Sequence, residues 1–394
     1  MEGPFALPPP ASAVGTRAAR DGAVPARRPI MIVAGTRPEC IKLAPVARAL
    51  DRRLGLEPVV VNSGQHPEAV RRTFAEFRVT CDLELPALPP APNLTQALRA
   101  LVREIDRAIR QVQPAAVIVQ GDTLTAYAGA RGAAASGCRV VHVEAGLRAP
   151  TARDPFPEEW FRRRIARHAD VHFAPCDSAH ANLLAEGTPP ERIHRVGNTG
   201  IDSLRSLLAA HPVAPEDTPH RVLVTLHRRE NWDERADVVC AALTDLAAAK
   251  PHLRFLLPVH PNPRIATRLR KRLGTHPQFD LAPPLAYREF ITAAATAALV
   301  ISDSGGIQEE IPHLGVPLLV PRSCTERPEG VATGFVRIVS VDREAIVREA
   351  LSMLAAPRRA GLPFDEGAPF GDGLSATRIA NVLEAMLAEA VTVP

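Results

Sequence analysis

A segment in the second half of the chain combines a glycine turn with a carboxylate about one helical turn further on. Residues 302–310 read Ser-Asp-Ser-Gly-Gly-Ile-Gln-Glu-Glu and follow an apolar run that ends at Ile301. This pattern predicts a buried strand, a tight turn and the start of a helix. Small residues at a helix N-terminus let backbone N–H groups approach a phosphate, and a serine adds a hydroxyl donor. A capped helix start without a ligand is the alternative. The candidate phosphate ligands are Ser304, Gly305 and Gly306, and the candidate acceptor for ribose hydroxyls is Glu310.

Three carboxylates of the first half have positions suited to acid–base chemistry. Asp122, Glu144 and Glu158 lie at or just beyond the ends of predicted strands. The carboxyl ends of parallel strands share one edge of a sheet, and ligands bind at that edge. Proton transfer to and from a sugar carbon needs one group that takes a proton and another that donates one or supports charge. Each acid taken alone also fits a solvated surface residue or a helix cap.

Histidines and cations follow several other predicted strands. His227 begins the segment His-Arg-Arg-Glu after one strand, and His260 follows another. Either imidazole can bind a phosphate or protonate a leaving phosphate, with a structural imidazole as the alternative. Arg37 and Lys42 flank the first glycine turn, and Arg327 lies in the segment Thr-Glu-Arg-Pro-Glu. Isolated cations usually face solvent, but at turns after strands they are candidate phosphate clamps.

Other motifs are missing from the sequence. The segment from His227 to Glu230 is not a metal-binding motif, so it predicts no metal site. The chain contains neither Gly-x-x-x-x-Gly-Lys-Ser/Thr nor Gly-x-Gly-x-x-Gly. Triphosphate hydrolysis and dinucleotide redox chemistry are therefore disfavoured.

Short apolar strands alternate with helical segments in both halves of the chain, and these elements must position the candidate residues. The first glycine turn, residues 35–39, leads into a predicted helix at residues 41–50. Alternation of this kind predicts an α/β fold of two similar Rossmann-like halves, joined near residues 200–217. The predicted strands are residues 30–34, 57–62, 115–120 and 139–143 in the first half, and 221–225, 254–257, 299–302 and 317–320 in the second.

Length and composition set the class of protein. A chain of 394 residues, 46% hydrophobic and 23% charged, is expected to form two globular domains. A net charge of +4 without basic runs interleaved with aromatic residues gives no indication of nucleic-acid binding. No apolar run is long enough to cross a bilayer. Six cysteines without a Cys-x-x-Cys pair favour a reducing cytoplasm. Residues 1–28 have no apolar signal core and are expected to form a disordered tail.

Taken together, these segments resemble the non-hydrolysing bacterial UDP-N-acetylglucosamine 2-epimerase family. The resemblance runs in order from about residue 29 to residue 388. The matching segments are 35–39 with 41–42, 64–66, 121–123, 142–148, 157–159, 197–199 with Asp202, 227–230, 258–260, 303–310, 325–329 and 369–373.

The resemblance implies a fold and an assembly. The expected architecture is glycosyltransferase-B-like, with two Rossmann-like domains that face a cleft and UDP held mainly by the second. The expected boundaries are residues 1–28 for the tail, 29–205 for the N-terminal domain, 206–370 for the UDP-binding domain, and 371–394 for a C-terminal helix packing back on the N-terminal domain. A cytoplasmic homodimer with no metal or redox cofactor is expected, with a nucleotide sugar as its partner.

The resemblance also implies a reaction and a set of site residues. The expected reaction inverts C2 of a UDP-N-acetylhexosamine, UDP-GlcNAc to UDP-ManNAc, by elimination of UDP and re-addition through a glycal. The expected catalytic residues are Asp122, Glu144, Glu158 and His227. The expected substrate-binding residues are Arg37, Lys42, His66, Arg148, Arg162, His260, Ser304, Gly305, Gly306, Glu310 and Arg327.

Several residues depart from the family pattern. Trp160 and Phe161 precede Arg162 where smaller residues are usual, and Phe335 replaces a common threonine. These aromatic residues would change the sugar pocket unless they turn into the core. Pro67, after the Gly-Gln-His segment, makes a second, activating UDP-GlcNAc site doubtful. The alternatives are therefore an epimerase for another nucleotide sugar or nucleoside phosphate, a glycosyltransferase of the same fold, and a nucleotide-binding regulator. Under the first alternative, Phe161→Asn should improve turnover of UDP-GlcNAc.

Overall fold

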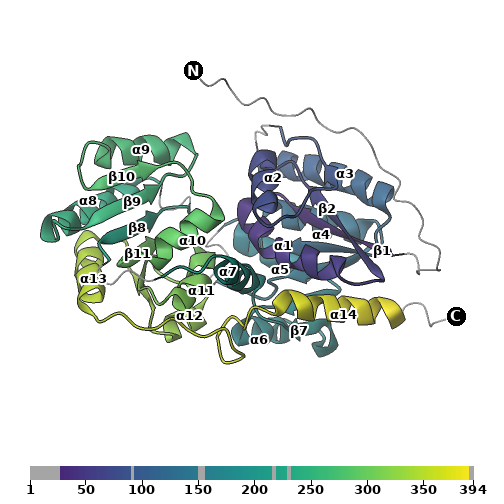
Figure 1. Cartoon of the computed structure of the whole chain (residues 1–394). Helices are drawn as coiled ribbons and strands as arrows, with labels where there is room; N and C mark the ends of the chain where they lie inside the picture. The colour runs from purple at the N-terminus through teal and green to yellow at the C-terminus, as the bar shows by residue number, and fades with distance from the viewer. Residues whose placement is uncertain (1–26, 90–92, 150–155, 215–218, 229–231, 390–394) are drawn as a thin grey trace, which may run out of the picture.

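The computed structural model describes residues 27–89, 93–149, 156–214, 219–228 and 232–389 (Figure 1). Most of the predicted tail therefore lies outside the described residues. The described strands form two parallel sheets, with seven strands in the order β3-β2-β1-β4-β5-β6-β7 and six in the order β10-β9-β8-β11-β12-β13. The predicted α/β fold of two Rossmann-like domains is confirmed. None of the described helices is long and apolar enough to span a membrane.

The first sheet and its helices come from the first half of the chain. In chain order the elements are β1 (Arg28–Ala34), α1 (Arg37–Asp51), β2 (Leu56–Asn62), α2 (Pro67–Glu76), β3 (Leu83–Glu84), α3 (Leu94–Val112), β4 (Ala116–Gln120), α4 (Leu124–Ala135), β5 (Arg139–Val143), α5 (Glu158–Ala166), β6 (Val171–Ala174), α6 (Asp177–Ala185), η1 (Pro190–Arg192), β7 (Ile193–Arg195) and α7 (Thr199–Ala210).

The second sheet and the C-terminal helix follow. In chain order the elements are β8 (Arg221–Thr225), α8 (Glu234–Ala249), β9 (Arg254–Pro258), α9 (Pro263–Leu273), β10 (Phe279–Ala282), α10 (Tyr287–Ala295), β11 (Leu299–Ser302), α11 (Gly305–Leu314), β12 (Leu318–Pro321), α12 (Pro328–Ala332), β13 (Val336–Val339), α13 (Arg343–Ala355) and α14 (Ser375–Glu389).

The strand order determines where a ligand crevice is expected in each sheet. The chain runs outward from β1 to β3 and then returns to the other side of β1 at β4, and β8 and β11 stand in the same relation in the second sheet. In doubly wound sheets the ligand crevice lies at such reversals, beyond the carboxyl ends of the two strands. The turns after β1, β4, β8 and β11 therefore position the candidate residues.

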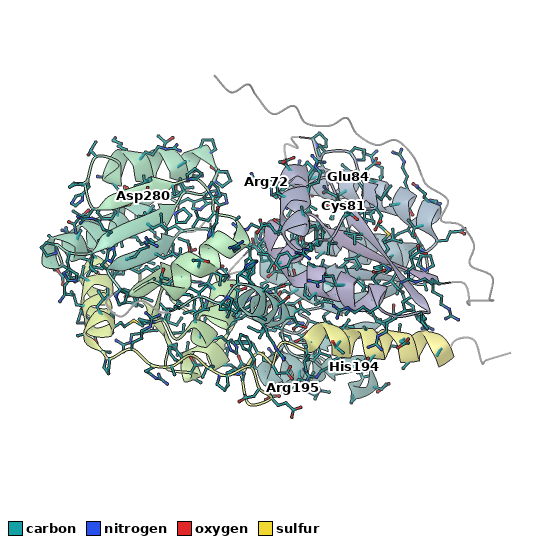
Figure 2. All side chains as sticks on the ribbon, in the orientation of Figure 1. Arg72, Cys81, Glu84, His194, Arg195 and Asp280 are labelled. Carbon is teal, nitrogen blue, oxygen red and sulfur yellow. The ribbon has the colours of Figure 1, made fainter. Side chains whose placement is uncertain are left out.

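The strands have apolar sequences because helices cover both faces of each sheet. All five residues of β4, Ala-Val-Ile-Val-Gln, are buried, and β1 is buried from Ile30 to Ala34. Parallel strands that are buried on both faces have nearly continuous apolar sequences. The outer strands carry charged side chains instead, such as Glu84 on β3, Arg195 on β7 and Asp280 on β10 (Figure 2). Charges on edge strands discourage pairing with another sheet.

The C-terminal helix α14 belongs to the core of the first domain. Ile379, Leu383 and Leu387 of α14 are buried in one hydrophobic cluster with Ile30 of β1 and Leu43 of α1. Figure 1 shows α14 running along the first domain after the chain has passed through the second. The residue boundaries given for the domains stay a prediction.

The two aromatic residues before Arg162 turn into the core. Phe161 on α5 is 2% exposed, and its ring stacks on Tyr127 of α4 with 5.4 Å between centroids. Trp160 is partly buried and contacts the same tyrosine edge-on, at 5.2 Å. Both rings therefore fill the interface between α4 and α5. They give no support to an altered sugar pocket.

The third departure, Phe335, lies at the amino ends of the strands of the second sheet, whereas the candidate residues follow their carboxyl ends. It directly precedes β13, is 4% exposed and lies under the guanidinium of Arg359, 4.4 Å from the ring centre. The ring lines a cavity of about 360 Å³ at the amino ends of β8, β11, β12 and β13. Phe335 therefore lies away from the carboxyl ends of the strands, where the candidate residues are.

Replacing Phe161 should destabilise the protein. Phe161→Asn removes a buried ring and places an amide among apolar side chains, and we expect a loss of about 3 kcal/mol in the free energy of unfolding. Turnover of UDP-GlcNAc per folded molecule should not improve. Urea denaturation and a turnover assay measure the two quantities. Leu54→Asn is the control because Leu54 is 80% exposed. Wild-type stability with faster turnover would contradict the core assignment.

Candidate active site

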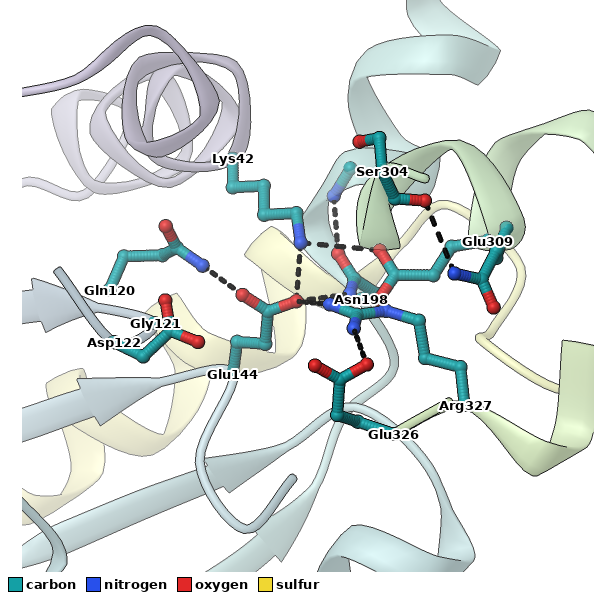
Figure 3. Close-up of polar contacts among 12 residues, drawn as sticks. Lys42, Gln120, Gly121, Asp122, Glu144, Asn198, Ser304, Glu309, Glu326 and Arg327 are labelled. Carbon is teal, nitrogen blue, oxygen red and sulfur yellow. Dashed lines mark hydrogen bonds and ion pairs between the residues drawn. The ribbon is translucent and has the colours of Figure 1, made fainter. Parts of the chain in front are cut away.

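A ring of ion pairs joins the two domains where their carboxyl edges meet (Figure 3). The ion-pair ring consists of Lys42 and Glu144 from the first domain and Glu309 and Arg327 from the second. Lys42 Nζ pairs with Glu144 and lies 3.2 Å from Glu309 Oε2. Arg327 lies 2.5 Å from Glu309 Oε1 through Nε and 3.3 Å from Glu144 Oε1 through Nη2. Cations and carboxylates thus alternate, and all four side chains are less than 10% exposed.

Glu144 is held in an unusual geometry. Its φ of +63° lies in the left-handed region, which costs a non-glycine residue about 1 kcal/mol or more. Its carboxylate accepts hydrogen bonds from the amides of Gln120 and Asn198, the latter at 3.2 Å. Burial alone would raise the pKa of Glu144, but the charges of Lys42 and Arg327 lower it to about 2. Glu144 is therefore ionised, and its carboxylate is held in one orientation by these hydrogen bonds and ion pairs.

A second buried carboxylate, Glu326, collects arginines from both domains. Arg228 and Arg322 each approach it to 2.9 Å, and Arg162 of the first domain to 3.6 Å. Burial would raise the pKa of Glu326, but the charges of these arginines and of Arg327 hold it far below its usual range. Arg162 also pairs with Asp122, whose side chain stays 25% exposed. The two domains therefore share this cluster as well.

The other two acids of the first domain remain accessible. Asp122 follows Gly121 in the turn after β4, and Figure 3 shows it next to Glu144. Glu158 is the first residue of α5 and is half-buried, and among the described residues it has no hydrogen-bond or ion-pair partner. An accessible carboxylate is available for exchange of protons with a ligand or solvent.

The turn after β8 presents His227. The backbone N–H groups of His227 and Arg228 donate to the Asp303 carboxylate at 2.8 and 3.1 Å, which anchors this turn to the end of β11. His227 is exposed, and its ring packs edge-on against His260 with 5.8 Å between the ring centroids. Desolvation and the positive charge of Arg37 lower the pKa of His227, while Asp303 opposes them.

The turn after β11 has the predicted form of an anion site. Helix α11 begins at Gly305, and Ser304 is its N-cap without a side-chain capping bond. A side chain at Gly305 would clash with Arg327, whereas Gly306 faces open space. Backbone N–H groups and the Ser304 hydroxyl can therefore bind an anion at the positive end of the helix.

Glu310 of the second domain and Arg37 of the first interact through their charges. Glu310 of α11 is 7% exposed and accepts a hydrogen bond from the Tyr287 hydroxyl at 2.7 Å. Burial raises its pKa to about 7. Burial lowers the pKa of Arg37, while the charges of Glu76 and Glu310 act against it. A buried acceptor on α11 and a cation at the start of α1 thus interact across the two domains.

The Glu310 pKa predicts a dependence of stability on pH. Its folded-state pKa of about 7 lies above the ordinary value of 4.5, so folding favours the protonated acid. That stabilisation is full below pH 4.5 and is lost as the pH rises through 7. Glu310→Gln keeps a neutral group at every pH. We therefore expect the variant to gain about 1 kcal/mol relative to wild type between pH 6 and pH 8.

Thermal unfolding of wild type and Glu310→Gln at pH 6, 7 and 8 measures this gain. A stability difference that stays constant with pH would show that Glu310 is ionised throughout the range. Glu68→Gln, an exposed carboxylate of α2 that pairs with Arg71, is the control and should show no such trend.

Two predicted residues lie apart from the ion-pair ring. Arg148 makes a bidentate pair with Glu186 at 2.8 and 2.6 Å and also donates to its neighbour's carbonyl, so its charge is directed toward the end of α6. His66 is exposed at the N-cap of α2. The sequence gives no role to four residues that complete the two clusters: Gln120, Asn198, Glu309 and Glu326. Gln120 ends β4 and Asn198 precedes α7, so their places at element ends were the available signal.

Among the described residues, no group of three or more His, Cys, Asp or Glu side chains is placed to hold a metal ion.

The fold and the site define a two-domain protein of the glycosyltransferase-B type, with acids on one domain opposite a candidate anion-binding turn on the other. The glycosyltransferase of kitacinnamycin shares this fold, with a TM-score of 0.55 at 14% identity. Residues 48–384 match the UDP-N-acetylglucosamine 2-epimerase family. The chain belongs to this family.

Relatives of known sequence and structure cover nearly the whole chain. The UDP-N-acetylglucosamine 2-epimerase of Salmonella typhimurium is 35% identical over 370 residues, which is 90% of this chain and 98% of the relative. The Neisseria meningitidis UDP-GlcNAc 2-epimerase, solved bound to UDP-GlcNAc, is 30% identical with a TM-score of 0.83, over 91% of this chain and 100% of that one. An S. aureus protein solved with UDP is 32% identical with a TM-score of 0.85, over 93% and 99%.

Proposed function

We propose that the protein inverts C2 of UDP-N-acetylglucosamine to give UDP-N-acetylmannosamine. The observation that carries the proposal is the ion-pair ring, which sets the ionised Glu144 beside Asp122 and opposite the Ser304–Gly306 turn. Acids for C2 and donors for a diphosphate then lie on the two sides of one interdomain site. The activities and ligands of the relatives agree with this substrate.

The proposed reaction has two stages. First a carboxylate removes the C2 proton while the C1–O bond to UDP breaks, which leaves a C1=C2 double bond in a glycal. The diphosphate oxygen then re-forms the bond to C1, and an acid delivers a proton to the other face of C2. Asp122, Glu144 and Glu158 are the proposed acids and bases. Because the two stages work on opposite faces, more than one carboxyl group is required.

Besides these carboxyl groups, the reaction requires stabilisation of the negative charge on the leaving diphosphate. As the C1–O bond breaks, negative charge grows on the diphosphate, and preorganised donors stabilise it. Ser304, Gly305 and Gly306 would supply N–H and hydroxyl donors, with His227 and Arg37 beside them. Lys42 and Arg327 add fixed positive charge from the two domains. Glu310 would hold the ribose hydroxyls.

Four other predicted residues are proposed as further contacts of the substrate. Arg162 pairs with Asp122 and so acts next to the proposed acid, and His260 packs on His227. Arg148 is occupied by Glu186 and His66 is exposed at the start of α2. We keep both as proposed contacts of the substrate. We also propose a cytoplasmic homodimer, and the six free cysteines fit a reducing compartment.

Proton NMR with UDP-GlcNAc in deuterated water tests the function. Appearance of the manno isomer with deuterium at C2 would establish both the substrate and the elimination route. A glycosyltransferase of the same fold need not exchange the C2 proton, so transfer without exchange would identify that alternative. An unchanged spectrum from folded protein would contradict the proposal, and other nucleotide sugars would be tested next.

A further inference from the structure

The buried carboxylate of Glu39 joins two turns of the site. Glu39 lies in the first turn of α1 and is 0% exposed. Its Oε2 accepts hydrogen bonds from the Gly35 N–H at 3.0 Å and the Thr36 hydroxyl at 2.8 Å. Its Oε1 accepts one from the Thr123 hydroxyl at 2.6 Å. The first two donors belong to the turn after β1 and the third to the turn after β4, so one side chain spans both turns.

The same two turns carry proposed site residues. Arg37 directly follows the first turn, and Asp122 directly precedes Thr123 in the second. The turns also interlock through Gly35, where a side chain would clash with the Thr125 hydroxyl of α4. Close contact on one side and Glu39 on the other therefore fix the spacing of the turns.

The length of Glu39 matters more than its charge. Gly35 N–H can only donate, so it needs an oxygen in front of it, whereas the threonine hydroxyls can either donate or accept. A glutamine amide satisfies the same partners, with its oxygen toward Gly35 and its NH2 toward Thr123. Burial raises the pKa of Glu39 to about 7, so the neutral and ionised forms both occur near neutral pH. A shorter carboxylate cannot reach both turns.

We propose that Glu39 is a positioning residue that sets the distance between Arg37 and Asp122. The inference rests on the proposed epimerase function of that site. Glu39 itself would contact neither substrate nor reacting atoms. A small displacement of a catalytic group can lower the rate of an enzyme by about 100-fold.

Two variants separate length from charge. Glu39→Gln keeps the length and loses the charge, and we expect kcat within about threefold of wild type. Glu39→Asp keeps the charge and loses one methylene, and we expect kcat to fall by about 10- to 100-fold. Deuterium incorporation at C2 measures kcat, and thermal unfolding reports whether each variant is folded. Thr123→Val and Thr123→Ser give a second comparison, because only serine keeps the hydroxyl that bonds to Glu39; the valine variant should be about tenfold slower than the serine variant.

Asp202→Asn is the matched control. Asp202 is also buried and caps α14 by accepting hydrogen bonds from the N–H groups of Ser375 and Ala376 at 3.2 and 2.8 Å. This variant should melt at a lower temperature with unchanged kcat. An active Glu39→Asp with an inactive Glu39→Gln would assign the role to charge and overturn the proposal. So would Glu39→Asp with wild-type kcat. Absence of C2 exchange in wild-type protein would instead overturn the proposed function, and this inference with it.

Discussion

Replacing Glu144 by glutamine should lower the rate of C2 epimerisation by about 1000-fold. The variant keeps the shape of the side chain but removes the carboxylate that Lys42 and Arg327 hold ionised. Glutamine cannot take a proton from C2. Deuterium incorporation at C2 in heavy water, followed by NMR at saturating UDP-GlcNAc, measures the loss directly.

Binding should survive the same change. The Ser304–Gly306 turn and the cations remain, and removal of a negative charge from the site does not oppose an anionic ligand. Titration calorimetry with UDP checks this. Glu384→Gln is the control, because Glu384 is a half-exposed residue of α14 that pairs with Arg53. If Glu144→Gln keeps full activity, Glu144 is not an acid or base of the reaction. If UDP binding is lost in addition to activity, its main role is to hold the ligand site together.

Arg327→Met should lower the free energy of unfolding by about 3–5 kcal/mol and also impair turnover. Removing one partner of a buried ion pair leaves the remaining charge desolvated and uncompensated. Arg327 is 6% exposed and contacts Glu309, which is 1% exposed, so the loss falls on a buried carboxylate. Methionine fills a similar volume, which keeps the effect of packing small. Urea denaturation measures the change.

A surface arginine provides the comparison. Arg343 on α13 makes a bidentate pair with Asp245 at 2.6 Å through both nitrogens, yet its side chain is 56% exposed. Arg343→Met should leave stability nearly unchanged, because solvent screens exposed pairs. Equal losses of unfolding free energy in the two variants would mean that a buried ion pair of the ring stabilises the protein no more than an exposed pair does. A stable but inactive Arg327→Met would limit its role to the ligand.

The sequence was a good guide to the central strands. The predicted bounds of β5 and β8 agree with the structure, and those of β4 differ by one residue. These strands are buried on both faces, so their apolar runs are continuous. The edge strands β3, β7, β10 and β13, and β6 next to β7, were not predicted. Edge strands are partly exposed and carry polar residues, so the apolar run that marks a strand is interrupted.

The candidate site was predictable only in part. Residues at strand ends, such as Asp122 and Ser304, lie where the periodicity of the chain placed them. Glu326 became a site residue only through folding, because arginines from separate segments of both domains surround it. No local pattern specifies such a cluster. The i, i+4 spacing of Phe161 and Ile165 was a signal that Phe161 points into the core, because the two residues share one buried face of α5.

The place of α14 has a consequence for biosynthesis. The first domain contains the earliest strands of the chain, yet Ile379, Leu383 and Leu387 complete its core. During translation, that domain leaves the ribosome with a hydrophobic face uncovered until α14 has been made. The second domain has no such dependence and can mature earlier. Nascent chains should therefore need protection at the beginning of the sequence, and a truncation that removes α14 would damage the domain whose strands come earliest in the chain.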